Sequence, residues 1–143
     1  MNEGMIKARE WLDEIERLRT QIGLFSAEYD AACKSINLLP GVSYDGIHVQ
    51  VSTKDNRILA QIEELTDKLH RLSDGIRELE QVRSERVKMI GRLREPDHIE
   101  VLYLRYVKGL YFWEVAQEMK ISERNVYYLH NGALAELWEV MRK

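Results

Sequence analysis

Apolar residues recur at heptad spacing near the start of the chain. Between Trp11 and Ile36 they follow one another at alternating steps of four and three residues. This spacing keeps one face of a helix apolar and is typical of helices that pack lengthwise in coiled coils. We therefore predict one long helix over residues 4–36. Its seam consists of Trp11, Ile15, Leu18, Ile22, Phe25, Tyr29, Ala32 and Ile36.

A second seam with the same spacing follows and predicts another long helix, over residues 57–93. The two helices have similar lengths, so we expect them to pair as an antiparallel hairpin. The next seam positions are Arg83 and Arg86, so the seam ends or changes partner near Leu79. Two helices bury only a thin core, and we therefore expect a homodimer, such as a four-helix bundle. The second seam consists of Ile58, Ile62, Leu65, Leu69, Leu72, Ile76 and Leu79.

Residues 37–56 interrupt this periodicity. Pro40-Gly41 and Asp45-Gly46 are turn-forming pairs, and Ser, Thr, Asp and Asn gather between Ser52 and Asn56. Valine alternates with polar residues around His48, and the Asp45-Gly46 pair is suited to closing a small hairpin. We expect a mobile loop that contains a short extended piece.

Residues 95–143 predict three shorter helices. Pro96 suits a first helical turn, Gly109 can end a helix at positive φ, and Ser122 is a good N-cap. The three apolar faces are Ile99, Leu102, Tyr103 and Tyr106; Phe112, Val115, Ala116 and Met119; and Val126, Leu129, Ala133 and Leu137. Two helices joined by a short turn and supported by a preceding helix are typical of a helix-turn-helix unit.

The predicted fold class is therefore all-α, in two domains. Residues 1–94 form a long, coiled-coil-like antiparallel helical hairpin with its loop at 37–56, which we expect to be the dimerisation region. Residues 95–143 form a tri-helical helix-turn-helix domain. Charged residues make up 31% of the chain and apolar residues 45%, as in soluble folded proteins.

The chain shows few signs of catalytic or metal chemistry. Its four histidines are scattered without ligand spacing, and it has neither a phosphate-binding glycine loop nor a nucleophile elbow. The single cysteine, Cys33, excludes an intramolecular disulfide and favours the cytoplasm. Apolar runs are too short to span a membrane. We expect no enzyme, no catalytic residue, no metal, no cofactor and no membrane partner.

The third predicted helix carries an unusual polar face opposite its apolar stripe. A solvated face is usually rich in Glu and Lys, whereas this one presents Arg, Asn and two tyrosines, which can donate to base edges and phosphates. We therefore predict binding of double-stranded DNA through Ser122, Glu123, Arg124, Tyr127, Tyr128 and Asn131. The alternative is a three-helix bundle whose exposed face has no function or binds protein.

Charge distribution adds candidate phosphate contacts. The net charge is −3, and residues 95–143 contain six Lys or Arg against eight Asp or Glu, so the predicted domain is not basic. Between Arg83 and Arg94, however, five cations accompany one anion. Such a patch attracts DNA without reading its sequence. The candidate phosphate contacts are Lys120, Arg105, Lys108, Arg83, Arg86, Arg92 and Arg94, with Lys88 in the same patch.

The C-terminal part resembles the fourth region of bacterial sigma factors, which reads the upstream promoter element. The resemblance covers about 40 residues and is carried by Leu102, Leu104-Arg105-Tyr106, Gly109, Glu114-Val115-Ala116, Met119, Ile121-Ser122, Val126, Leu129 and Ala133-Leu134. The whole layout is similar to ArpU/RinA-type regulators of late transcription in phages of Gram-positive bacteria. This resemblance implies a phage or prophage transcription regulator in the bacterial host cytoplasm that activates late genes and contacts RNA polymerase.

The chain departs from the sigma pattern at the residues that would read DNA. Sigma factors have arginines at the places of Glu123 and Tyr127, a glutamine at Tyr128 and usually glycine at Lys120. We therefore expect a different target sequence and either a remodelled turn or a left-handed Lys120. Two alternatives remain: a small terminase-like packaging protein, and an adaptor that binds polymerase without reading DNA.

Overall fold

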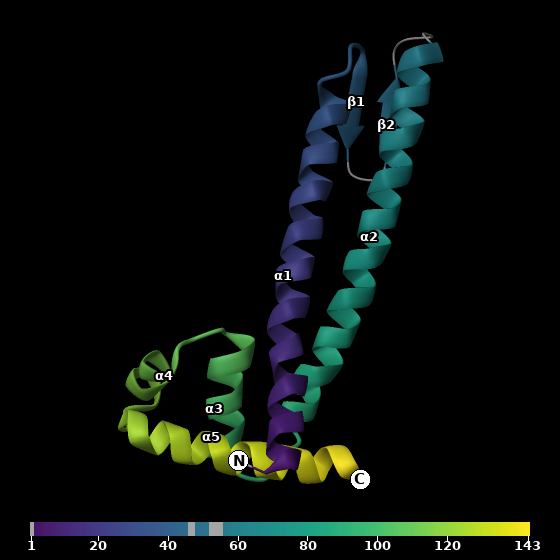
Figure 1. Ribbon diagram of the computed structural model, residues 1–143. Coiled ribbons are helices and arrows are strands. Elements are labelled where there is room, and N and C mark those ends of the chain that lie inside the picture. Colours follow the sequence, from purple (N-terminus) through teal and green to yellow (C-terminus); the bar gives the residue numbers. More distant parts are fainter. Residues whose placement is uncertain (1, 46–47, 52–55) are drawn as a thin grey trace. The chain divides into compact units, whose positions relative to one another are not determined.

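The computed structural model describes residues 2–45, 48–51 and 56–143. Most of these residues are helical, which confirms the all-α class (Figure 1). The predicted Asp45-Gly46 turn lies partly outside the described residues. The elements are α1 (Glu3–Asn37), β1 (Val42–Asp45), β2 (His48–Val51), α2 (Asn56–Ile90), α3 (Pro96–Leu102), the π-helix η1 (Tyr103–Val107), α4 (Phe112–Met119) and α5 (Glu123–Arg142).

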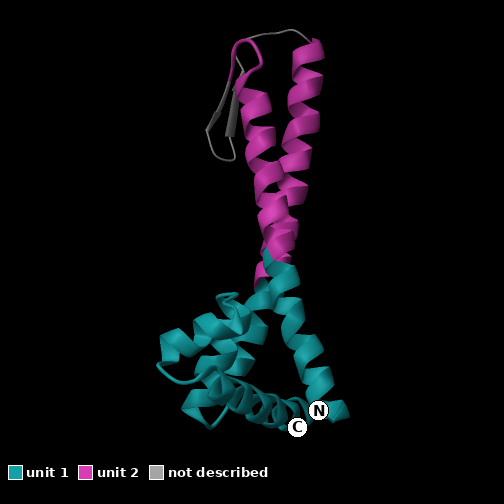
Figure 2. Cartoon of the chain, turned by 60° about the vertical axis from the view of Figure 1, so that its left-hand side comes forward, with its two compact units in different colours: residues 1–19, 81–143 teal, residues 20–80 magenta. Residues whose placement is uncertain are grey.

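The chain divides into two compact units, and both long helices contribute to each (Figure 2). Unit 1 combines Met1–Arg19 with Gln81–Lys143, and unit 2 is Thr20–Glu80. The predicted boundary at residues 94–95 coincides with a change of helix, because α3 begins at Pro96 after an extended Glu95. Packing, however, groups the first turns of α1 and the last turns of α2 with the three C-terminal helices.

Unit 2 is a helical hairpin with a small sheet in its connection. Ile36 and Leu69 are almost fully buried in one cluster with Ala32, as the two seams predict. A Cβ atom on Gly75 of α2 would lie 3.4 Å from the Phe25 ring of α1, so the seam residue Phe25 lies against α2. The connection contains the expected extended piece, an antiparallel pair of β1 and β2. Its register is Val42↔Val51, Ser43↔Gln50, Tyr44↔Val49 and Asp45↔His48.

Unit 1 has one core to which α1, α2 and the C-terminal helices all contribute. Ala8, Leu12 and Ile15 of α1 are fully buried there. Gly4 lies against the indole of Trp138 in α5, where any Cβ atom would lie about 2.3 Å from the ring and would clash. The remaining buried apolar residues of this core are Ile90, Leu93, Val101, Leu102, Leu104, Tyr106, Val115, Ala116, Val126, Ala133, Leu134 and Leu137.

The first C-terminal helix changes from α to π geometry at Tyr103. The Lys108 amide donates to the Tyr103 carbonyl five residues earlier, at 3.0 Å. A π turn holds more residues than an α turn, so it rotates the following side chains relative to a 3.6-residue period. The predicted apolar face is wrong at Tyr103, the first residue of η1, which is 41% exposed, while Leu104 after it is buried.

The structure decides the backbone conformation at both ends of α4, including the choice between a remodelled turn and a left-handed Lys120. Gly109 has a φ of 73°, and Lys120 occupies the left-handed region at φ 58°, ψ 43°. The Lys120 backbone thus makes the turn that glycine usually makes. Ser122 caps α5, because its hydroxyl accepts a hydrogen bond from the Asn125 amide at 3.1 Å. Helix α5 therefore begins directly after Ser122, as predicted.

Glu136 of α5 ties the start of α3 to the same unit. Its carboxylate accepts hydrogen bonds from the Arg94 amide and from Nδ1 of His98, the latter at 2.8 Å. Burial alone would raise the pKa of Glu136, but these hydrogen bonds outweigh burial and lower that pKa. Gly132 leaves room for the His98 ring, since a Cβ atom there would lie 2.9 Å from it.

In the described part of the chain, no helix is both long and apolar enough to cross a bilayer.

Candidate functional site

The polar face of α5 forms one exposed surface. Helix α5 buries Val126, Ala133 and Leu137 in the core, so the opposite side chains face outward. Tyr127 is 47% exposed and Tyr128 63%. Five of the six residues predicted on this helix face line one shallow hollow of about 400 Å³, the recognition hollow: Glu123, Arg124, Tyr127, Tyr128 and Asn131. The sixth, Ser122, is exposed at the N-cap.

Contacts with neighbouring side chains hold several residues of the recognition hollow in place. The Tyr127 ring lies 4.7 Å from the Phe112 ring of α4, centroid to centroid, so α4 holds it in place. The Arg124 guanidinium lies 5.8 Å from the Tyr128 ring, and its Nη2 donates to the Tyr128 hydroxyl at 3.5 Å. The hollow therefore offers amide, guanidinium and hydroxyl donors with one carboxylate acceptor, a set that can bond base edges.

Three of the predicted phosphate contacts have partners inside unit 1 instead. Arg86 Nη1 donates to the Trp11 carbonyl at 2.8 Å, and its guanidinium lies 4.8 Å from the Trp11 ring. Arg83 Nη2 donates to the Val107 carbonyl at 3.4 Å. Arg105 Nη1 donates to the Leu110 carbonyl at 3.2 Å, within the turn before α4. All three side chains are partly buried, and these contacts give each of them a role in holding the fold of unit 1.

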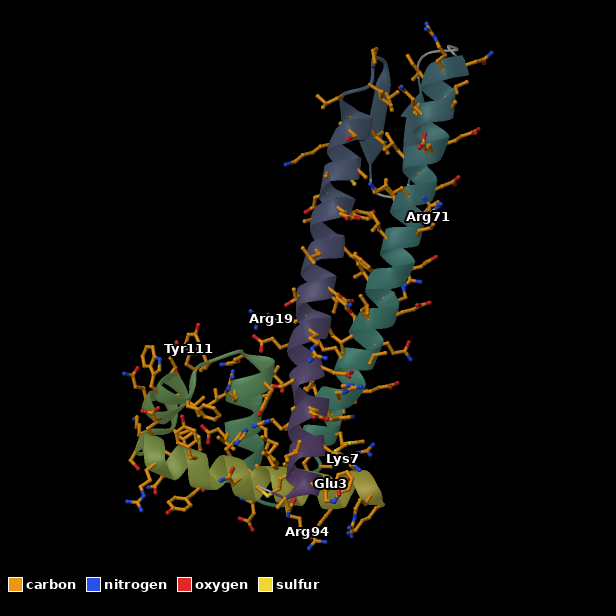
Figure 3. All side chains as sticks on the ribbon, in the orientation of Figure 1. Glu3, Lys7, Arg19, Arg71, Arg94 and Tyr111 are labelled. Atoms are coloured by element: carbon orange, nitrogen blue, oxygen red, sulfur yellow. The ribbon has the colours of Figure 1, made fainter. Side chains whose placement is uncertain are left out.

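The other predicted cations remain exposed. Lys88, Arg92, Arg94, Lys108 and Lys120 all lie at the surface of unit 1. None of them lines the recognition hollow, although Lys120 is two residues before the Ser122 cap of α5. Lys108 also has a structural role through its carbonyl, which accepts a hydrogen bond from Arg19 of α1 at 3.4 Å; Figure 3 shows Arg19 projecting from α1.

A buried polar pair beneath the polar face was not predicted. The Tyr106 hydroxyl and Nε2 of His130 are 2.6 Å apart, and both residues are buried. Burial, assisted by the charges of Arg105 and Arg9, lowers the pKa of His130 to about 4. Burial and the Asp13 carboxylate raise the pKa of the Tyr106 phenol. Residue spacing could have located His130, because it follows Val126 by four residues and precedes Ala133 by three.

The residues that the structure describes contain no candidate metal site. Within them, His, Cys, Asp and Glu side chains do not form any group of three or more that could hold a metal ion. Cys33 is half-buried and packs against the core of unit 2.

Comparisons with known proteins give one family. No curated protein matches the chain, and no solved structure matches it. A family model described as "Protein of unknown function (DUF1492)" matches residues 43–138, which is more than half of the chain. The matched segment contains all of α2, α3, η1 and α4 and most of α5, including every residue of the recognition hollow. The chain therefore belongs to the DUF1492 family.

Proposed function

We propose that this protein is a sequence-specific regulator of transcription that places α5 in the major groove of double-stranded DNA. The observation that carries the proposal is the recognition hollow, where five side chains with base-reading chemistry share one exposed surface. Helix α5 is capped by Ser122 and anchored in the core by Val126 and Ala133, so the hollow is presented on a rigid element. A helix-turn-helix unit reads DNA through such a face, with the first turns of its last helix nearest the bases.

Within this proposal the side chains have different tasks. Arg124 and Asn131 are the residue types that bond guanine and adenine edges through two hydrogen bonds each. Tyr128 is suited to a thymine methyl or a phosphate, and Lys120 to a phosphate beside the turn. Tyr127 is held by Phe112 and provides an apolar wall. The net charge of −3 means that base contacts and a few local cations must outweigh general repulsion.

The resemblance to ArpU/RinA-type regulators and to the fourth sigma region supports a finer version of the proposal. In that version the protein acts in the cytoplasm of a bacterial host, activates late phage genes and contacts RNA polymerase. The DUF1492 match does not bear on these steps, which rest on the resemblance alone.

The proposal includes a homodimer formed through unit 2. Leu24 of α1 and Leu38, which directly follows the last residue of α1, are 62% and 84% exposed. They lie fourteen residues apart, two heptads, with the exposed Ala27 and Ala31 between them on the same side of the helix. Small residues between leucines permit two copies of α1 to approach closely, and burying exposed leucines would stabilise their association. A two-fold dimer would present two copies of α5 to two half-sites.

The decisive experiment selects bound duplexes from a random DNA pool and then titrates variants against the selected and a scrambled duplex at one salt concentration. Arg124→Ala, Tyr128→Ala and Asn131→Ala should each lose roughly 1–3 kcal/mol on the selected duplex and little on the scrambled one. Arg142→Ala, which removes an exposed cation near the other end of α5, is the matched control and should bind as the wild type does.

Two outcomes would favour the alternatives. If all three variants discriminate between the duplexes as well as the wild type does, α5 does not read DNA, and a polymerase-binding adaptor becomes the better explanation. Light scattering separates the regulator from a terminase-like protein, because a dimer fits the first and a ring of about eight or more copies fits the second.

A further inference from the structure

A second hollow adjoins the recognition hollow within unit 1. Its volume is about 320 Å³, and Tyr127 and Asn131 line both hollows. The exposed face of α5 therefore continues into a cavity whose other walls come from η1, from the start of α4 and from the first turns of α1. The residues contributed by α1 are Arg9 and Asp13. This places the N-terminal helix beside the surface that we propose reads DNA.

The charges that line this cavity favour an anion. Arg9 and Arg105 provide two positive charges, and Asp13 provides one negative charge. His130, which also lines the cavity, is neutral at pH 7 because its pKa is about 4. The two arginines contribute to that low value, which means that their positive field reaches the cavity wall. One positive charge therefore remains in excess.

Of the two arginines, Arg9 has binding capacity left. Arg105 Nη1 is occupied by the Leu110 carbonyl and its Nε is buried, so Arg105 contributes charge to the cavity rather than a further ligand. Arg9 is exposed, and although Asp13 lies four residues further along α1, the two are not joined by an ion pair in the part of the chain that the structure describes. A guanidinium that is neither neutralised nor fully hydrogen-bonded is well suited to a phosphate oxygen.

We propose that this cavity, with Arg9 as its principal ligand, receives a backbone phosphate of the duplex whose bases face α5. The inference rests on the proposed function. A phosphodiester carries one negative charge, which matches the excess charge of the cavity. Phosphates border the major groove on both sides, about 12 Å apart, so a strand beside Tyr127 and Asn131 can bring one to the adjoining cavity. The DNA-binding surface would thus combine α5 with α1, a helix far from it in sequence.

The test measures DNA affinity over a range of salt concentrations for four proteins: the wild type, Arg9→Ala, Asp13→Asn and Arg17→Ala. Arg17 is the matched control, because it is an exposed arginine of α1 that lines neither hollow. Arg9→Ala should weaken binding to selected and scrambled duplexes alike, by roughly tenfold, and should lower the salt slope by about one. Asp13→Asn should bind more tightly, and Arg17→Ala should match the wild type. Unchanged melting temperatures show that the fold is retained.

The other outcomes show whether the phosphate site alone fails or the proposed function fails with it. If Arg9→Ala has the affinity and salt slope of Arg17→Ala while the wild type still discriminates between duplexes, the phosphate site is refuted and the proposed function stands. If the wild type binds no DNA, both are refuted. A titration with inorganic phosphate, monitored through the NMR signals of the His130 ring, tests whether the cavity binds a free anion instead of a DNA phosphate. Saturable phosphate binding together with no effect of Arg9→Ala on DNA would assign the cavity to a free ligand and overturn the proposal.

Discussion

The buried His130–Tyr106 pair should make the stability of unit 1 depend on pH. The imidazole of His130 is 4% exposed and forms its 2.6 Å hydrogen bond to the Tyr106 hydroxyl in the core. Burial and the nearby arginines disfavour the protonated ring, so the folded state keeps His130 neutral where the unfolded state would already bind a proton. Acidification is therefore expected to favour unfolding.

The sign and size of the effect follow from the two pKa values. Above pH 6.5 the ring is neutral in both states, and His130 adds no pH dependence. Between pH 6.5 and about pH 4 the unfolded state binds more protons, so the free energy of unfolding falls as the pH falls. A pKa difference of about 2.5 corresponds to roughly 3 kcal/mol at most, and this loss is complete once the pH is below the folded-state pKa.

The assay is urea unfolding, followed by circular dichroism, of the wild type and His130→Gln across this pH range. Glutamine can accept the Tyr106 hydrogen bond but does not titrate, so the variant should lose less stability on acidification, by up to about 3 kcal/mol. His70→Gln is the control, because His70 is exposed in unit 2 and its replacement should leave the pH profile unchanged. Protonation of Glu136 at acid pH also lowers the free energy of unfolding in every variant, because the folded state lowers the pKa of this carboxyl group. Parallel losses for wild type and His130→Gln would refute the reasoning.

Two further substitutions test features of unit 1. Arg86→Met should reduce the free energy of unfolding by about 2–4 kcal/mol, because it removes the hydrogen bond to the Trp11 carbonyl, the contact with the Trp11 ring and the partly exposed ion pair with Glu14 at 3.2 Å. A urea midpoint equal to that of the control Lys88→Met would contradict this. Lys120→Gly should raise the melting temperature, since the left-handed backbone costs lysine about 1 kcal/mol and glycine adopts it without that cost. A lower melting temperature than that of the wild type would show that the Lys120 side chain stabilises the fold by more than this strain.

Local chemistry explains which parts of the fold the sequence predicts. Gly109 and Ser122 adopt the expected conformations, and Lys120 adopts the left-handed one of its two predicted alternatives, because each depends on neighbouring backbone atoms. The seam residues Ile36 and Leu69 are buried because heptad spacing constrains a long helix whatever follows it. The polar face of α5 could be predicted for the same reason, since its apolar stripe determines the opposite side.

Other features depend on distant partners, which spacing does not reveal. Arg86 and Arg92 are equivalent in a count of charges, but only the first has Trp11 and Glu14 within reach. Leu12 is fully buried although it lies outside the predicted seam, because α1 packs in the core of unit 1 as well as along α2. Tyr103 faces outward at the start of a π turn, which no residue type in its neighbourhood requires.

The division of unit 1 between the two ends of the chain has a consequence for protein synthesis. Ala8, Leu12 and Ile15 leave the ribosome long before α5 has been translated, yet their core is completed by Ala133, Leu134 and Leu137. The hairpin of unit 2 lies entirely between these segments and can form first, which would bring Arg19 and Gln81 together and shorten the loop that unit 1 must close. Nascent chains that stall before α5 would expose the apolar face of the first turns of α1, which makes them natural substrates for chaperones.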